Sequence, residues 1–143
     1  PLGDGRWQIC LDRSYPGAAT YLAVRAPGDA DIRTVVQPCH INLKKNDTGR
    51  KQTITFAPIA DVPLGTQSIR LVARSSADLP VRFFVRAGPA VIHGDELEFT
   101  PVPPRSQLPL TVTVDAWQWG RSTAPAVQTA PLAERQFKIL PTK

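Results

Sequence analysis

Hydrophobic and polar residues alternate along much of the chain with the period of two that is typical of half-buried β-strands. In residues 110–115, for example, Val112 and Val114 would face a core while Thr113 and Asp115 point away from it. Proline and glycine clusters separate these segments, and no stretch has a convincing helical period. The pattern predicts strands over residues 6–11, 20–25, 32–36, 39–43, 52–57, 68–74, 80–86, 96–100, 110–115 and 135–140. Short strands separated by turns predict an all-β chain, folded as an antiparallel β-sandwich.

The order of strands in the first fifty residues resembles the order in the second half of the chain. The strand with Leu22 and Val24 precedes the strand with Val112 and Val114 by 90 positions. We therefore predict one complete sandwich over residues 51–143, and a strand-rich partial unit over residues 1–50 that corresponds to the C-terminal half of a preceding unit. Asn46-Asp47-Thr48 matches a glycosylation sequon but is interpreted as the turn between the units.

Composition and chain start narrow the class of protein further. Of 143 residues, 42% are hydrophobic, which is enough for a core, and 15 are proline, which would interrupt long helices. No apolar run approaches the roughly 18 residues of a membrane span, so no membrane insertion is expected. Because the chain begins with Pro1, we expect a piece of something longer. Half a sandwich leaves strand edges unpaired, so residues 1–50 are expected to pack tightly on the second unit or to associate between chains.

The net charge of +5 comes from scattered basic residues rather than from blocks, which argues against a nucleic-acid site. One arginine-rich face is nevertheless predicted, because two consecutive strands carry arginines on their outward sides. If these strands pair, four guanidinium groups flank one aromatic ring and could bind an anionic glycan. The alternative is an ordinary solvated surface. The residues of this predicted face are Arg70, Arg74, Arg82, Phe84 and Arg86.

The sequence has no nucleophile elbow, phosphate loop or zinc-protease motif, and so no motif points to an enzyme. Glu96 and Glu98 share one face about 7 Å apart, a spacing that suits a glycosidase pair only within a cleft. We interpret them as surface partners of Arg82 and Arg86. The histidines lack a metal-ligand spacing. We expect no enzyme activity, no cofactor and no metal.

Cys10 and Cys39 lie on predicted strands of the first unit. They could form a disulfide, which would fit an exported protein. Alternatively, both are buried free thiols that act as small hydrophobic residues.

Trp117 and Trp119 are two residues apart, so in a strand their indoles would point to the same side about 7 Å apart. Such a pair could stack on sugar rings. The alternative is that both indoles pack against an end of the core or against a neighbouring domain.

Residues 51–143 contain a series of short motifs in a fixed order. They are Gln52-Thr53-Ile54-Thr55-Phe56, Ile59-Ala60-Asp61, Leu64-Gly65-Thr66, the run from Ile69 to Ser76, Leu79-Pro80-Val81-Arg82-Phe83, Gly88-Pro89-Ala90, Gly94-Asp95-Glu96-Leu97 and Val112-Thr113-Val114. With these motifs in this order, residues 51–143 resemble the bacterial immunoglobulin-like repeats of large secreted and cell-surface proteins. The stretch Trp117-Gln118-Trp119-Gly120-Arg121 departs from the small polar turn of most such repeats and is similar to repeats appended to carbohydrate-active enzymes.

This resemblance implies an immunoglobulin-like module without catalytic residues, one of a tandem series in a larger exported bacterial protein. Such a module would act as a spacer, an adhesion unit or an accessory domain, outside the cell or at its surface, with neighbouring domains of the same polypeptide as its partners. The alternative function is a carbohydrate-binding module that holds a polysaccharide on the tryptophan pair and the arginine face.

Overall fold

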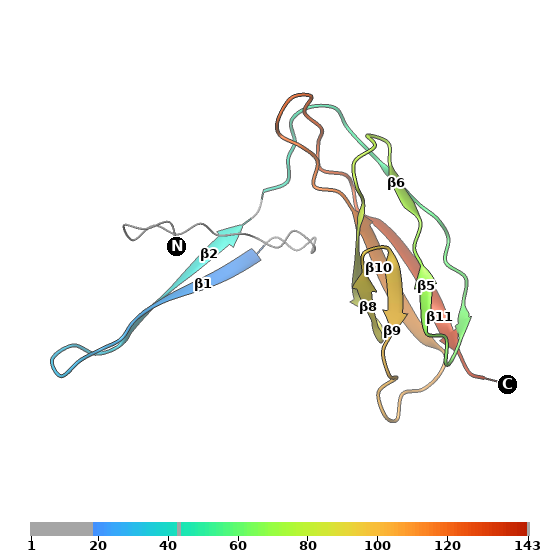
Figure 1. Cartoon of the computed structure of the whole chain (residues 1–143), viewed down its shortest axis with the longest axis horizontal. Coiled ribbons are helices and arrows are strands. Elements are labelled where there is room, and N and C mark those ends of the chain that lie inside the picture. The colour runs from blue at the N-terminus through green and yellow to red at the C-terminus, as the bar shows by residue number, and fades with distance from the viewer. Residues whose placement is uncertain (1–18, 43, 143) are drawn as a thin grey trace. The chain divides into compact units, whose positions relative to one another are not determined.

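The computed structural model describes residues 19–42 and 44–142, with Ala19, Thr20 and Asn42 described by their backbone alone. The chain divides into two compact units, Pro1–Lys44 and Lys45–Lys143 (Figure 1). Every regular element of the described residues is a β-strand, so the predicted all-β class is confirmed. The second unit starts at Lys45 rather than at residue 51, because residues 46–50 hydrogen-bond to residues 126–129.

In the first unit, the described part is a β-hairpin. Strand β1 (Ala19–Ala26) pairs antiparallel with β2 (Val35–Asn42), and Leu22 lies opposite Cys39. The two strands predicted over residues 32–36 and 39–43 are in fact one strand that continues through Pro38. Proline lacks an N–H donor but is tolerated in an edge strand, and among the described strands β2 pairs with β1 alone. The strand predicted over residues 6–11 lies outside the described residues.

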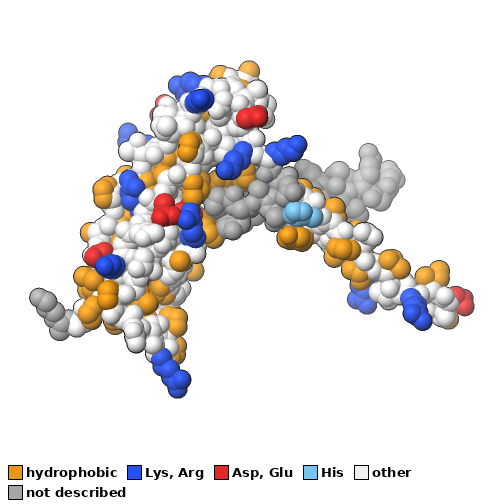
Figure 2. Space-filling view, turned by 180° about the vertical axis from the view of Figure 1, so that it is seen from behind, with side chains coloured by type: hydrophobic (Ala, Val, Ile, Leu, Met, Phe, Trp, Pro, Cys, Tyr) orange, Lys and Arg blue, Asp and Glu red, His pale blue; other side chains and the backbone are white. Residues whose placement is uncertain are grey.

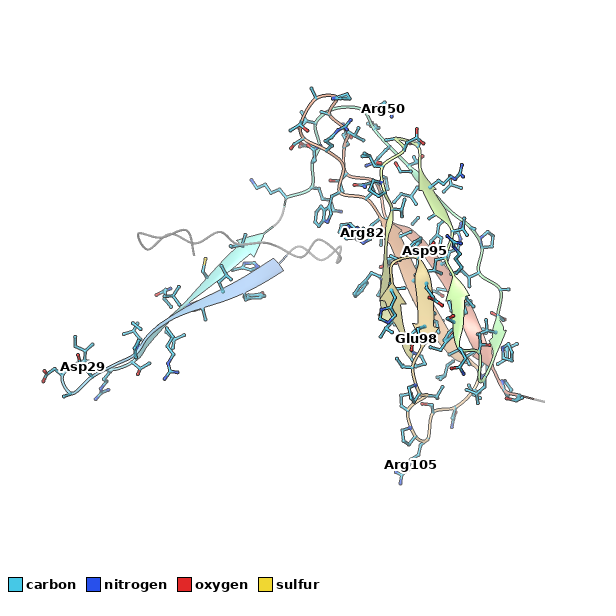
Figure 3. All side chains as sticks on the ribbon, in the orientation of Figure 1. Asp29, Arg50, Arg82, Asp95, Glu98 and Arg105 are labelled. Carbon is cyan, nitrogen blue, oxygen red and sulfur yellow. The ribbon has the colours of Figure 1, made fainter. Side chains whose placement is uncertain are left out.

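The hairpin turn is closed by the side chain of Asp29, which lies at the tip of the hairpin (Figure 3). Its Oδ1 accepts the backbone N–H groups of Asp31 at 2.9 Å and Ile32 at 2.8 Å. These two hydrogen bonds, that of Asp31 first, lower the pKa of Asp29 below its ordinary value of 3.8. A carboxylate in this position is a common way to order a turn.

We expect this turn to loosen only in strong acid. A lowered pKa means that the stabilisation is complete above the ordinary value of 3.8 and is lost as the pH falls through the lowered pKa. The NMR shifts of the Asp31 and Ile32 amides should therefore titrate with a midpoint below 3.8. In Asp29→Asn the amide oxygen still accepts both bonds, so the same signals should stay flat. A midpoint above 3.8 in the unsubstituted chain would contradict the assignment.

The second unit consists of sheets on two sides of one core, and all of their strand pairings are antiparallel except that of β4 with β11 (Figure 1). One side is a four-stranded sheet of order β4 (Val62–Pro63), β11 (Ala133–Leu140), β10 (Leu110–Trp117), β7 (Arg82–Ala87). The other side has the pair β3 (Ile54–Phe56) and β6 (Ala73–Ser75), and the three-stranded sheet β5 (Ser68–Arg70), β9 (Glu96–Phe99), β8 (Ala90–His93). The buried core residues include Phe56, Phe83, Leu97, Val112, Val114 and Phe137.

One predicted strand is divided in the structure. Residues 68–74 keep the predicted alternation, with Leu71 buried between the exposed Arg70 and Val72. The segment changes partners at its centre, because the Leu71 N–H donates to Asp95 O, whereas the Val72 carbonyl accepts the Ala57 N–H. Its two ends therefore belong to different sheets as β5 and β6.

Two strands were missed by the sequence pattern. Strand β4 has two residues, which is too short for a period of two to be recognised, and β8 begins with three consecutive apolar residues, Ala90, Val91 and Ile92, which do not alternate with polar ones. Strand β4 pairs in parallel with β11, so that Val62 lies beside Ile139 and Pro63 beside Leu140. This short pairing joins an early segment of the second unit to its last strand.

Candidate functional site

The outward face of β7 and β10 collects most of the candidate side chains. Arg82 lies opposite Trp117 and Phe84 lies opposite Asp115, and residues opposite each other point to the same face of a sheet. The predicted arginine face of four is wrong, because β7 pairs with β10 rather than with the strands that carry Arg70 and Arg74. Those two arginines belong to the β5–β9–β8 sheet and the β3–β6 pair respectively.

Arg86 is held by two carboxylates on this face. Its Nε and Nη2 donate to the two oxygens of Asp115 at 2.8 and 2.7 Å, and its Nη1 contacts Glu134 at 2.5 Å. The Asp115 side chain is only 3% exposed and that of Arg86 is 47% exposed. The hydrogen bond to Asp115 is the main cause that raises the pKa of Arg86. This arginine neutralises a buried carboxylate and is not presented as a free cation.

The two glutamates on β9 have partners other than those predicted. Strand β9 lies between β5 and β8, and so Arg82 and Arg86 of β7 are not its neighbours. Glu96 instead accepts the Ser68 hydroxyl at 2.5 Å, and Glu98 lies 3.3 Å from His93 Nε2. Figure 3 shows Glu98 and Asp95 on the surface of this sheet.

The tryptophan pair does not form a platform. Trp117 is 3% exposed, and the rings of Trp117 and Trp119 meet edge-on, with centroids 4.8 Å apart and planes at 80°. A sugar needs exposed ring faces to stack on, so the predicted platform is wrong and the packing alternative holds for Trp117. The strand pattern placed both indoles on one side but could not reveal that the segment after β10 covers the first.

The predicted disulfide involves a residue outside the described range. Cys39 is an exposed free thiol, so the expectation of a buried thiol is wrong for this residue, and Cys10 lies outside the described residues. Within residues 19–42 and 44–142, no group of three or more His, Cys, Asp and Glu side chains could hold a metal ion.

Residues 45–52, which we call the strap, hydrogen-bond to the loop after β10, and the sequence pattern did not predict this contact. Asn46 exchanges hydrogen bonds with Thr129, donating its N–H to the hydroxyl at 2.8 Å and accepting the Thr129 N–H at 2.7 Å. The Asn46 side-chain amide also donates to Val127 O at 2.7 Å. The sequon asparagine is therefore a tie between the start of the second unit and the loop after β10.

The strap continues as a short ladder along the same loop. Arg50 donates to Ala126 O at 3.0 Å and accepts the Gln128 N–H at 2.9 Å. Gln52, which is 3% exposed, donates to Gln128 O and accepts the Ser75 hydroxyl, both at 2.6 Å. In the loop, Gly120 has φ +80°, and an added Cβ would lie 2.3 Å from Val127 O, so a side chain there would disrupt the ladder.

A cleft of about 370 Å³ lies between the turn that joins β4 to β5 and the segment that follows β9. Its walls are apolar residues, prolines, one glycine, two threonines and one glutamine, without a carboxylate, histidine or cysteine. They include Val62, Thr66, Phe99, Val102 and Ile139. The cleft therefore offers mainly apolar contacts, with two threonine hydroxyls and one glutamine amide as its polar side-chain groups.

Comparisons with known proteins add no relative. A scan of protein families found no match, and neither did searches of curated proteins and of solved structures. In the described part of the chain, none of the elements is a helix with the length and apolar character needed to cross a membrane.

Proposed function

We propose that this chain is a non-catalytic structural module, an immunoglobulin-like spacer of a larger exported bacterial protein. The observation that supports the proposal is that backbone hydrogen bonds secure the second unit at both of its ends. The chain enters at the end marked by Arg50, and the C-terminus leaves near the opposite end, where Arg105 lies (Figures 1 and 3). A module with its ends at opposite poles transmits tension along its length.

Both ends are secured by pairing that opposes such tension. At one end the strap is bonded to the loop after β10, and at the other β4 runs parallel to β11. We call this parallel pairing of β4 with β11 the seam. It also includes the hydrogen bonds from Leu64 N–H to Leu140 O at 2.8 Å and from Lys138 N–H to Asp61 Oδ1 at 2.7 Å. Pulling the two ends apart would slide parallel strands past each other, so several hydrogen bonds must break together.

The alternative of a carbohydrate-binding module has weaker support. Its tryptophan platform is absent, and Arg86 is already occupied by Asp115 and Glu134. The polar groups of the strap serve internal bonds, as a structural role requires.

Pulling single molecules in two directions tests the spacer role. Handles are attached through cysteines introduced at Asp47 and Lys143 in a Cys10→Ser, Cys39→Ser background, which loads the seam along its length. In the control, handles at Ser106 and Lys143 pull β10 and β11 apart from one end, so their hydrogen bonds break one after another. We expect a clearly higher unfolding force in the first geometry, with a gain in length of roughly 30 nm. Equal forces, or a lower force along the seam, would refute the spacer role.

A further inference from the structure

The hairpin of the first unit has the same construction as the β10–β11 hairpin of the second. All four strands have eight residues. Leu22 lies opposite Cys39 as Val112 lies opposite Phe137, and seven further pairs of β1 and β2 extend the register. The two hairpins can therefore be compared position by position.

In the first hairpin the corresponding face is largely exposed, and of its apolar residues Leu22 and Ile41 are half-buried. Val112 and Val114 of the second unit are 0% exposed, because the opposite sheet packs on them. On the equivalent face of the first hairpin, Val24 is 69% exposed and Val35 is 54% exposed. We call this the apolar hairpin face; it consists of Leu22, Val24, Ala26, Val35, Cys39 and Ile41, with Gln37 between them.

The two faces of the hairpin differ in charge. The apolar hairpin face carries no charged side chain among its described residues, whereas the other face holds Arg25 and the stacked pair Tyr21 and His40, whose ring centroids are 4.7 Å apart. Figure 2 shows hydrophobic side chains along the hairpin and charged ones gathered towards its tip. A two-stranded sheet with such a face is marginally stable alone in water, so burial of this face would stabilise it.

We propose that the apolar hairpin face packs on the same face of a second copy of this chain. The face is its own complement under a two-fold axis, and no charge would be buried although each copy has a net charge of +5. Two such faces would meet as stacked sheets about 10 Å apart, the spacing of a sandwich core.

The small size of the face argues for a weak dimer. Eight residues and two strands give a footprint of roughly 27 by 10 Å per copy. With interdigitating side chains, the two copies would bury roughly 1,000 Å² in total, at the lower limit for a specific interface. We therefore expect a reversible dimer with a dissociation constant in the micromolar range. This inference is independent of the spacer role, which concerns the second unit.

Sedimentation velocity on the full chain tests the proposal, over about 1 to 200 μM to bracket a micromolar dissociation constant. The unsubstituted chain should shift from monomer to dimer. Val24→Lys should stay monomeric, because it places a charge in the interface. Ala23→Lys, the matched control, adds the same charge at the adjacent position on the opposite face and should still form the dimer. A chain that is monomeric throughout, a dimer that survives Val24→Lys, or one that both variants abolish would overturn the proposal.

The thiol of Cys39 gives a second measurement that does not depend on a variant of the face. In Cys10→Ser, alkylation of Cys39 by a maleimide should slow as the protein concentration rises, because the dimer covers this residue. Slow alkylation at every concentration would mean that the same chain covers the face, and fast alkylation at every concentration would mean that nothing does. Either result would overturn the proposal.

Discussion

Replacement of Arg86 by methionine is expected to lower the midpoint of thermal unfolding of the second unit by at least 10 °C, roughly the effect of leaving one buried charge unpaired. The reason is the carboxylate of Asp115, a side chain that is 3% exposed and that accepts two hydrogen bonds from this guanidinium. Methionine preserves much of the apolar contact of the arginine stem but cannot donate a hydrogen bond. Circular dichroism at 218 nm or so would follow the loss of the sheets directly.

Two variants separate this effect from a general loss of charge. Arg70→Met removes an ion pair with Asp95 whose side chains are 79% and 53% exposed, and such pairs contribute little. Its midpoint should barely move. Arg86→Met combined with Asp115→Leu removes the buried carboxylate together with its partner and should recover most of the stability. A single Arg86→Met variant as stable as Arg70→Met would show that Asp115 does not need its partner.

The alternation of residue types predicted the inward face of the strands well. In residues 80–86 it placed Phe83 inward and Arg82 outward, and in residues 96–100 it placed Leu97 inward between two exposed glutamates. This works because each residue reports locally which side of its own strand avoids water. The same local information yielded the all-β class.

The burial of outward residues could not be predicted in the same way. Asp115 and Trp117 lie on the outward side of β10, yet both are buried. Asp115 is covered by an arginine 29 positions away in sequence, and Trp117 is packed edge-on by Trp119. A period of two identifies the two faces of a strand but not what lies over each, so a polar residue inside the central strand was interpreted as surface.

Which strands pair with each other could not be predicted from the alternation of residue types either. The predicted arginine face required the strand of Arg70 and Arg74 to pair with that of Arg82, but hydrogen bonding divides the first strand between β9 and β3. Pairing is decided by contacts between distant segments, which alternation does not encode. The role of Asn46 depends in the same way on residues 81 and 83 positions away.

Leu97→Ala is expected to lower the free energy of unfolding of the second unit by about 3 kcal/mol. Leu97 is 0% exposed at the centre of the three-stranded sheet, opposite Ile69 on one side and Ile92 on the other. Truncation there removes apolar contacts and leaves a cavity that β9, paired along both edges, cannot easily collapse. Urea titration followed by tryptophan fluorescence would measure the change, because Trp117 is buried in the folded unit.

Val91→Ala provides the matched control on the neighbouring strand. Val91 is 40% exposed and lies opposite Glu98, so truncation removes little buried surface and should change the free energy of unfolding by less than about 1 kcal/mol. Equal losses in the two variants would mean that β9 is not at the centre of the core. Because the seam between β4 and β11 packs on this core through Val62 and Ile139, Leu97→Ala should also lower the unfolding force along the seam.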